Sequence, residues 1–536
     1  MKTRIELIYY IANRSRAVIN VVYDAIKIAS ELASISDVVA GGSKEKQVVE
    51  NIKRLLEDHV DAIRMEPVDV LSWEENFCVI YIDGVPHRCS IHPPYEGYVD
   101  LVAGRDELVY IGNFNDIVKV SKNIEGKIAI IESIEDPNYI ALYAYALRKY
   151  NPAAIVFVDK FNALRRIVAV DDIISRYNTL KPPLIPAVHV QRDTRLKLKN
   201  AANVRIIFKS KLSPSYGFNV IAEINGGDKG TMYLTAHHDH WFSGVIDDVL
   251  GISMLISLVK ARTLPYTIRN NVVLAFFTAE EGFPNPLSSF YWLVGSRHHV
   301  MSYADRILEE VHLVLNLDVV YRGKSRFSTS NLIARGFLIK SGIDVNSLEH
   351  DSMLYDSFSF SMLGIPSITM HNYYEAINDG IYHSTLDGVE LIEFIGVEAL
   401  SNVLYNIVVL LKNAYIVSDQ SQLRNILNLG LKTLAQDLAL KTLPLEVALE
   451  LYKVLRRLEQ CDDISKVLRL LPSLHRIITS TYIPKSVYEG AEIYEKTTYI
   501  PCYEDVIYLP LGISLNDDCY KNLLHNLESL TYILRC

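Results

Sequence analysis

The sequence predicts an α/β protein whose main domain is a mixed, mostly parallel sheet flanked by helices. Three observations support this prediction. Between about residues 216 and 417, short apolar runs alternate with longer stretches of helical periodicity. Polar and apolar residues do not alternate within these runs. Continuous apolar runs are typical of strands that are buried on both faces of a sheet. A β-rich segment with frequent turn residues precedes this region and a helical segment follows it, which predicts further domains.

The composition is that of a globular protein with several domains. The chain has 536 residues, of which 49% are hydrophobic and 22% are charged. This length suggests about three to four domains, and the composition excludes a disordered or fibrous chain. The formal net charge is −9, and Lys and Arg are spread along the chain without a basic block. We therefore expect no nucleic-acid partner and no membrane partner.

Targeting and redox signals are weak in this sequence. Residues 1–16 lack the apolar core and cleavage site of a signal peptide. No uninterrupted apolar run reaches the roughly 18 residues of a membrane span. These features predict a cytoplasmic protein, and a low Gln content beside abundant Ile, Leu, Lys and Glu favours a thermophile. The six scattered cysteines predict buried or idle thiols rather than a disulfide framework.

The pattern of predicted secondary structure changes at three places along the chain, which divide it into four segments. The first contains two amphipathic helices, at residues 1–35 and from Ser43, followed by the first part of the main domain. The second is β-rich with one helix at 138–150, and the last is mostly helical. The predicted boundaries are 1–75 for the first segment, 76–210 for the β-rich segment, 211–417 for the main domain and 418–536 for the helical segment.

The residues that carry chemistry gather at the carboxyl ends of predicted strands. The strands MYLTA and NVVLAFFTA are each followed by His or carboxylate side chains, and the strand HLVLNLDVV carries a carboxylate near its end. Two more candidates lie directly before helices. Ligands collect at such strand ends in open α/β sheets. The candidates are His237, Asp239, Asp247, Glu280, Glu281, Asp318 and His383.

Two histidines and three carboxylates supply the nitrogen and oxygen ligands that a pair of zinc ions needs, with one carboxylate bridging both ions. Each residue also has a structural interpretation. Asp247 alone is typical of a helix N-cap, and Glu280-Glu281 of a solvated turn. Ser384 and Asp387 resemble a capping arrangement. Asp318, however, lies in an apolar strand and needs a partner there. Because these signals occur together, they favour a metal site.

Other polar residues near these motifs have no assigned chemistry. Arg322 and Arg326 follow Asp318 and are predicted to be solvated, the alternative being contact with an acidic substrate side chain. Four histidines are predicted to lie on the surface or beside the site without binding metal. These are His238, His240, His298 and His299.

The motifs HHD, GVIDD, TAEEG, LNLDV and YHSTLD, in this order, resemble the co-catalytic di-zinc aminopeptidases of the twenty-eighth metallopeptidase family, clan MH. The resemblance is strongest to the glutamate carboxypeptidase II and transferrin receptor branch. The segment YDSFSFSMLGIP also resembles that family's S-D-x-x-x-F…G-I-P pattern, with Tyr355 in place of Ser. The resemblance implies a zinc-exopeptidase fold, a protease-associated (PA) domain at 76–210, and a dimerisation domain at 418–536 that would make the protein a homodimer.

The resemblance also implies a ligand set for two zinc ions, with cobalt or manganese as alternatives. His237 and Asp318 would bind one ion, and Glu281 and His383 the other. Asp247 would bridge the two.

Three further roles follow from the same resemblance. Asp239 would orient His237, a role that outer carboxylates play in many metal sites. Glu280 would be the general base. Tyr382 would donate a hydrogen bond to the tetrahedral intermediate.

The function that the resemblance implies is a zinc exopeptidase, foremost an aminopeptidase that removes N-terminal residues of peptides. A bridging hydroxide would attack the scissile carbonyl, and Glu280 would accept the proton. Two alternatives stay open. One is a glutamate carboxypeptidase-like enzyme acting on acidic peptides, and the other is a non-catalytic, receptor-like binding protein.

Overall fold

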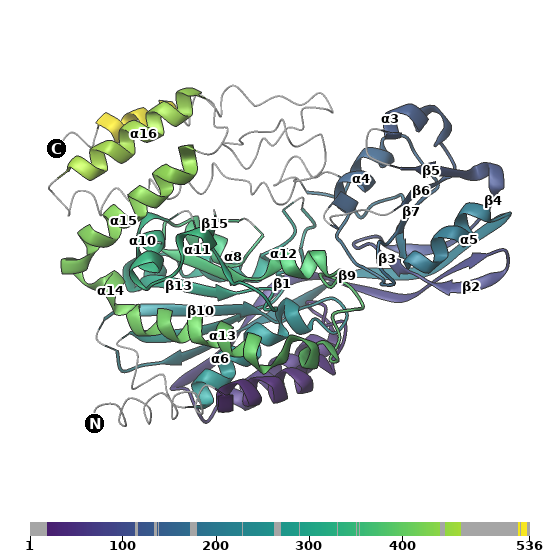
Figure 1. Ribbon diagram of the computed structural model, residues 1–536. Coiled ribbons are helices and arrows are strands. Elements are labelled where there is room, and N and C mark those ends of the chain that lie inside the picture. Colours follow the sequence, from purple (N-terminus) through teal and green to yellow (C-terminus); the bar gives the residue numbers. More distant parts are fainter. Residues whose placement is uncertain are drawn as a thin grey trace.

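The computed structural model describes residues 19–112, 116–132, 137, 139–171, 179–227, 229–261, 270–288, 290–329, 331–349, 351–352, 354–439, 445–461, 524–525 and 527–532. Within these residues a large twisted sheet is covered by helices on both faces (Figure 1). A second, smaller sheet lies at one end of the large one, on the right of the view. The α/β class predicted from the sequence is confirmed.

The main sheet is mixed and has eleven strands within the described residues. Its centre is parallel, because β10 pairs in parallel with β11 and β13, and β13 with β16. Towards one edge the pairing becomes antiparallel through β9 and β1. In spatial order the strands are β12 (Phe283–Pro284), β1 (Ala62–Ile82), β9 (Asn203–Ile224), β11 (Asn271–Phe277), β10 (Thr231–His237), β13 (Val311–Leu317), β16 (Ser367–His371), β14 (Arg326–Ser328) and β15 (Leu348–Glu349), with β2 (Val85–Arg88) and β4 (Gly97–Gly104) beside β1 and β9.

Both faces of the main sheet are buried, which explains the apolar strands. Along β10, Met232 and Leu234 belong to the largest core cluster, whereas Tyr233 belongs to a separate cluster on the other face. The first face packs against α2 (Ser43–Leu56), α6 (Leu250–Lys260) and α13 (Leu391–Asn413). The second face packs against α8 (Val294–Ser302), α9 (Ala304–Glu310) and α11 (Ser357–Ser361).

The second sheet follows the element order expected for residues 76–210, here called the insert. Its parallel strands are joined by α4 (Tyr139–Arg148), and α3 (Asp116–Val120) and α5 (Arg195–Asn200) also lie in the insert. In spatial order the strands are β3 (Ser90–Ile91), β8 (Ala187–Val190), β7 (Ala154–Val158), β6 (Ile128–Glu132) and β5 (Leu108–Ile111).

Two long strands connect the insert to the main sheet. β1 and β9 pair along almost their whole length, and Glu75 lies opposite Ser210, so the predicted boundaries fall at matching points of one ladder. The register shifts between Glu75 and Phe77, which marks a bulge there. The insert is therefore an extension of the same two strands, although the exact domain boundaries stay predictions.

Cys78 and Cys89 form a disulfide with a Cα–Cα distance of 5.1 Å. The prediction of idle thiols was wrong for these two residues. Val79 pairs with Arg88 in the β1–β2 hairpin, so the next residues outward, Cys78 and Cys89, lie opposite each other. Cys461 is disulfide-bonded as well.

The helices after residue 418 pack onto the main domain. α15 (Gln420–Ala439) crosses α10 (Leu332–Lys340) so closely that a Cβ on Gly336 would lie 1.8 Å from the Ile426 carbonyl oxygen. Apolar residues of α15 and α16 (Leu445–Gln460) belong to the largest core cluster. The first half of the helix predicted at 1–35, and residues 462–523 of the helical segment predicted at 418–536, lie outside the described residues.

One helical stretch, Leu391–Ser418, is long and apolar enough by length and composition to cross a membrane, with a mean hydropathy of 1.8. It comprises α13 and α14 (Tyr415–Ser418). The prediction from uninterrupted apolar runs did not find it, because a few charged residues interrupt it. Leu400, Val403 and Ile407 belong to the largest core cluster, and core helices of globular domains pass the same test.

Candidate metal centre

The predicted site residues converge at the carboxyl edge of the parallel strands. His237 is the last residue of β10, Glu280 and Glu281 follow β11, and Asp318 follows β13. Because β10 lies between β11 and β13, these three strand ends are neighbours. Asp247 lies in the Val245–Val249 segment before α6, and His383 in the loop between α12 (Tyr373–Asn378) and α13.

The five predicted ligands form two groups that share Asp247. His237 Nε2 lies 3.2 Å from Asp247 Oδ1 and 3.9 Å from Asp318 Oδ1. His383 Nε2 lies 3.2 Å from Asp247 Oδ2 and 2.5 Å from Glu281 Oε1. Within each group the ligand atoms lie within 4.8 Å of one another. We call His237, Asp247 and Asp318 the first triad, and Asp247, Glu281 and His383 the second triad.

The hydrogen bonding of these residues fits two bound cations. His237 Nε2, Asp247 Oδ2 and His383 Nε2 are buried and make no hydrogen bond within the described residues. Buried polar atoms rarely lack a hydrogen-bond partner. The other ring nitrogen, His237 Nδ1, lies 2.9 Å from the Asp239 carbonyl oxygen. Because Nδ1 then carries the proton, Nε2 keeps a lone pair that can bind a metal ion. Nitrogen and carboxylate oxygen donors in this number suit zinc.

Charge is concentrated at the centre. Burial lowers the pKa of His383, but the negative charges of Glu281 and Asp247 have the larger effect and raise that pKa to about 10. Burial raises the pKa of Asp318 to about 6, although His237 opposes that rise. Like-charged carboxylates confined in a buried space repel one another, so this cluster favours cations.

Comparison with known proteins finds a family model that matches the part of the chain holding this centre. Residues 219–408, which contain both triads, match the family model "Peptidase family M28". This part of the chain is similar to the metallopeptidases of family M28. The match covers the region from the end of β9 into α13. No protein of curated function matches the sequence.

Solved structures agree with this fold. The zinc aminopeptidase BSAP from Bacillus subtilis is 19% identical, with a TM-score of 0.55, over 73% of this chain and 95% of that chain. The peptidase M28 precursor from Shewanella amazonensis SB2B is 17% identical, with a TM-score of 0.57, over 76% of this chain and 96% of that chain. At such identities the likeness establishes the zinc-exopeptidase-like fold alone.

Glu280 and Tyr382 both border the cavity at the metal centre. This small cavity is bordered by Asp247, Glu280, Glu281, Asp318, Val319, Leu354, Tyr355, Tyr373 and Tyr382. Burial, followed by repulsion from Glu281 and Asp318, raises the pKa of Glu280 well above its usual range, although His237 opposes the rise. Burial also raises the pKa of Tyr382, which keeps its hydroxyl protonated as a donor.

Asp239 differs from its predicted role in the atoms it uses. Its carboxylate accepts hydrogen bonds from the main-chain N–H groups of Glu280 (3.0 Å) and Glu281 (3.1 Å). The main-chain carbonyl of Asp239, not its carboxylate, faces His237 Nδ1. The side chain therefore fixes the Glu280-Glu281 turn, because the β10 and β11 ends lie side by side.

Three residues next to the ligands adopt left-handed backbone conformations. Ala279 precedes Glu280, Val319 follows Asp318, and His383 is itself a predicted ligand; each has a φ of 52°. Such conformations cost of order 1–3 kcal/mol in non-glycine residues and concentrate at functional sites. They turn the chain sharply where each strand or loop presents its ligand.

The unassigned histidines have other partners. His238 Nε2 lies 3.2 Å from Glu45, and His299 Nδ1 lies 2.7 Å from Glu66. His240 is buried with Nδ1 3.1 Å from the Phe242 carbonyl, and His298 is exposed. They belong to neither triad.

The two arginines after Asp318 form ion pairs. Arg322 pairs with Asp379 and Arg326 with Glu349. Asp387 accepts a hydrogen bond from the Ile246 N–H, so it supports the segment that carries Asp247.

Sequence reasoning missed two contributors to the centre. The indole N–H of Trp241 donates to Glu281 Oε2 at 3.0 Å. Tyr373 borders the cavity beside Tyr382, and their rings are 5.0 Å apart. Trp241 directly follows the HHDH motif, so its position was a signal, whereas Tyr373 had none.

Proposed function

We propose that this protein is an M28 aminopeptidase with two zinc ions, the first held by His237 and Asp318, the second by Glu281 and His383, with Asp247 shared. The observation that carries the proposal is the pair of buried triads with Glu280 beside them. Zinc bound there would supply Lewis-acid chemistry, lowering the pKa of water and polarising a carbonyl.

The remaining chemistry falls to the protein's own side chains. Glu280 accepts the proton of the attacking water and passes it to the nitrogen of the leaving amine. Tyr382 donates a hydrogen bond from its hydroxyl to the oxygen that becomes negative as the carbonyl is attacked. Asp239 keeps Glu280 and Glu281 in their separate orientations through its two hydrogen bonds.

An amino-terminal substrate suits the lining of the cavity better than a carboxyl-terminal one. Acidic and aromatic side chains line it, and no Lys or Arg is among its described lining residues. A carboxypeptidase for acidic peptides needs cations to bind carboxylates, but Arg322 and Arg326 are engaged by Asp379 and Glu349. The aromatic residues favour an apolar first side chain.

A substrate panel tests this proposal. Zinc-loaded protein incubated with amino-acid anilides should cleave leucine and phenylalanine anilides, and N-acetylation should abolish cleavage. Preferential cleavage of N-blocked dipeptides with a C-terminal glutamate would instead support the carboxypeptidase. No cleavage of either set by protein that holds two zinc ions would support the receptor-like alternative.

The remaining sequence predictions are proposals about the surroundings of the centre. The strand order of the second sheet supports a PA domain at 76–210. A cytoplasmic homodimer, assembled through the helical C-terminal region, stays a prediction. Light scattering at micromolar concentration should give twice the 60.7 kDa of one chain, and a monomer would contradict it.

A further inference from the structure

A loop of the insert lies directly against the loop that carries His383. The Arg166 N–H donates to the His383 carbonyl at 3.1 Å, and the Thr385 N–H donates to the Leu164 carbonyl at 2.9 Å. Arg165 and Ser384 form an antiparallel bridge between these two segments. Segments more than 200 residues apart thus form a short ladder beside the second triad.

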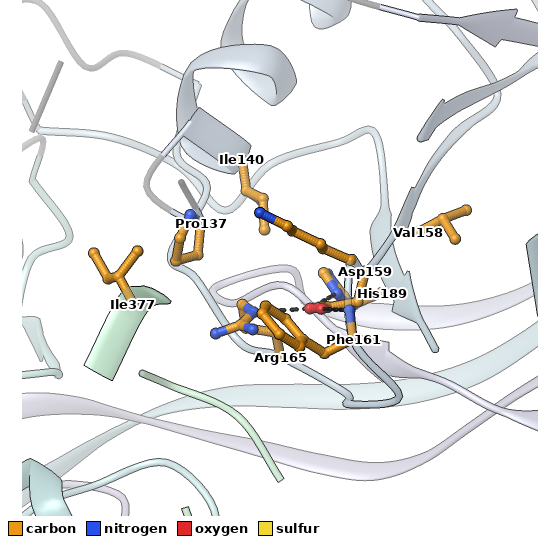
Figure 2. A pocket seen from close by; sticks show the side chains of 9 residues that line it. Pro137, Ile140, Val158, Asp159, Phe161, Arg165, His189 and Ile377 are labelled. Atoms are coloured by element: carbon orange, nitrogen blue, oxygen red, sulfur yellow. Dashed lines mark hydrogen bonds and ion pairs between the residues drawn. The ribbon is translucent and has the colours of Figure 1, made fainter. Parts of the chain in front are cut away.

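Arg165 extends this contact through its buried side chain. Its Nη2 donates to the Gly380 carbonyl at 2.9 Å, and its Nη1 donates to the Tyr382 carbonyl. Its Nε donates to Asp159 Oδ2 at 2.9 Å, and Asp159 also contacts His189 Nε2 at 2.8 Å. Figure 2 shows Asp159 between Arg165 and His189, with Ile377 of α12 across a cavity between the insert and the main domain. The planar guanidinium therefore fixes two carbonyls just before His383.

The His383 loop needs such support. His383 has a φ of 52°, a conformation that persists only when the surroundings enforce it. Gly380 has a φ of 76°, and a Cβ there would lie 2.3 Å from the Phe161 ring of the insert. The Tyr382 ring stacks on the His383 imidazole at 3.8 Å between centroids. The backbone that Arg165 binds thus determines where His383 Nε2 points.

Arg166 reaches the other unshared ligand of the second triad. Its guanidinium lies 5.9 Å from the Trp241 ring centroid and 4.6 Å from that of Phe242. Trp241 in turn donates its indole N–H to Glu281 Oε2 at 3.0 Å. Consecutive arginines of the insert therefore support His383 and Glu281, one through the main chain and one through Trp241.

The first triad has a different set of supports. His237 Nδ1 contacts the Asp239 carbonyl, and the His237 N–H donates to Asp248. The Asp318 N–H donates to the Met370 carbonyl at 3.3 Å. All of these partners lie within residues 219–408, the M28 match. Among the described residues, the insert therefore supports the second triad and not the first.

We propose that Arg165, assisted by Arg166 through Trp241, is a positioning residue that sets the metal affinity of the second triad while leaving the first unaffected. The inference rests on the proposed two-metal function. It makes the insert a structural part of the second metal site. Partners that orient a ligand typically change metal affinity by about 10–100-fold.

The test is a zinc titration of the full-length, metal-stripped protein with a competing chelator. The unsubstituted protein should bind two equivalents. Arg165→Gln should bind the first equivalent unchanged and the second about 10–100-fold more weakly. Arg165→Lys should fall between the two, because an ammonium keeps the charge beside Asp159 but not the planar fork. Equal affinity of Arg165→Gln and the unsubstituted protein for the second zinc would overturn the inference.

Two further variants separate positioning from folding. Trp241→Phe keeps the ring and removes only the donor to Glu281, so it should also weaken the second zinc alone. Arg148→Gln is the matched control, since Arg148 is buried in the insert and binds Ala169, Ile185 and Asp171 of the insert itself. It should lower Tm and leave both affinities unchanged; an equal loss of the second zinc in Arg148→Gln and Arg165→Gln would overturn the inference. If the unsubstituted protein binds fewer than two equivalents, the proposed function itself fails.

Discussion

Two buried polar clusters in this protein both lie beside parallel strands, but the carboxylate of one is paired with an arginine, whereas the other gathers several carboxylates. The metal centre follows parallel strands of the main sheet, and the insert cluster, formed by Asp159, Arg165 and His189, lies beside parallel strands of the second sheet. In the insert cluster Asp159 is paired with an arginine and a histidine. In the metal centre His237 Nε2 and His383 Nε2 make no hydrogen bond to any part of the chain that the structure describes.

The difference teaches how a metal site can be told from a structural cluster. Burial opposes ionisation of Asp159, but contacts from His189 and Arg165 outweigh it and hold its pKa well below the usual range. That cluster carries its own cation. The metal centre gathers Asp247, Glu280, Glu281 and Asp318 without a Lys or Arg among its described lining residues. A cluster that has more buried carboxylates than cationic side chains, together with unpaired histidine nitrogens, therefore indicates a site for a metal cation taken up from solution.

The largest expected effect is on catalysis at the metal centre. Glu280→Gln keeps the shape of the side chain and removes the proton acceptor, so kcat should fall by about 10²–10⁴-fold. Zinc content should stay at two per chain, because Glu280 belongs to neither triad. Steady-state kinetics beside metal analysis would check this. Normal turnover in this variant would remove the general base from the mechanism.

Breaking the insert cluster should lower the stability of the fold, in addition to any effect that Arg165 transmits to the second triad. Asp159→Asn leaves the buried Arg165 without its charged partner, and breaking a buried pair typically costs about 3–5 kcal/mol. Urea unfolding measures this loss. Asp100→Asn is the control, because its pair with Arg205 lies at the surface and such pairs contribute little. Similar losses in both variants would show that the insert cluster is no more important than a surface ion pair.

A ligand substitution in the second triad should weaken zinc binding rather than remove catalysis outright. Glu281→Gln replaces a carboxylate by a neutral amide, and we expect the second zinc to bind about 10–100-fold more weakly. Excess zinc should restore part of the activity, whereas it should not rescue Glu280→Gln. If both variants keep two zinc ions and comparable activity, the adjacent glutamates are only a solvated turn.

The smallest expected effect is on the dependence of folding stability on pH. Burial, assisted by the neighbouring His189, holds the pKa of His92 well below its usual value. The unfolded chain therefore binds more protons than the folded one below about pH 6.5, and stability should fall as the pH drops through that value. One histidine contributes at most about 1.4 kcal/mol per pH unit. His92→Asn should flatten the dependence of urea unfolding on pH between 6.5 and 5; an unchanged slope would contradict this.

Much of the metal centre could be predicted because the relevant signals are local. His237, Glu280 and Asp318 each follow an apolar strand, and the carboxyl ends of adjacent parallel strands must meet. The contribution of Asp239 was predicted less accurately, since spacing does not distinguish a carboxylate contact from a carbonyl contact. The Cys78–Cys89 disulfide was missed because it depends on the register of one hairpin.

The sequence by itself determined the α/β class, the succession of strands and helices along the main domain and the candidate residues at the strand ends, because periodicity is a property of short segments. Only the tertiary structure decided how those residues are held. Arg165 and His383 are separated by more than 200 residues, and nothing in either local pattern indicates the other. Their contact exists because β1 and β9 continue from the main sheet into the insert and bring its loop against the second triad. Such packing depends on the register and twist of long paired strands, which a single sequence does not reveal.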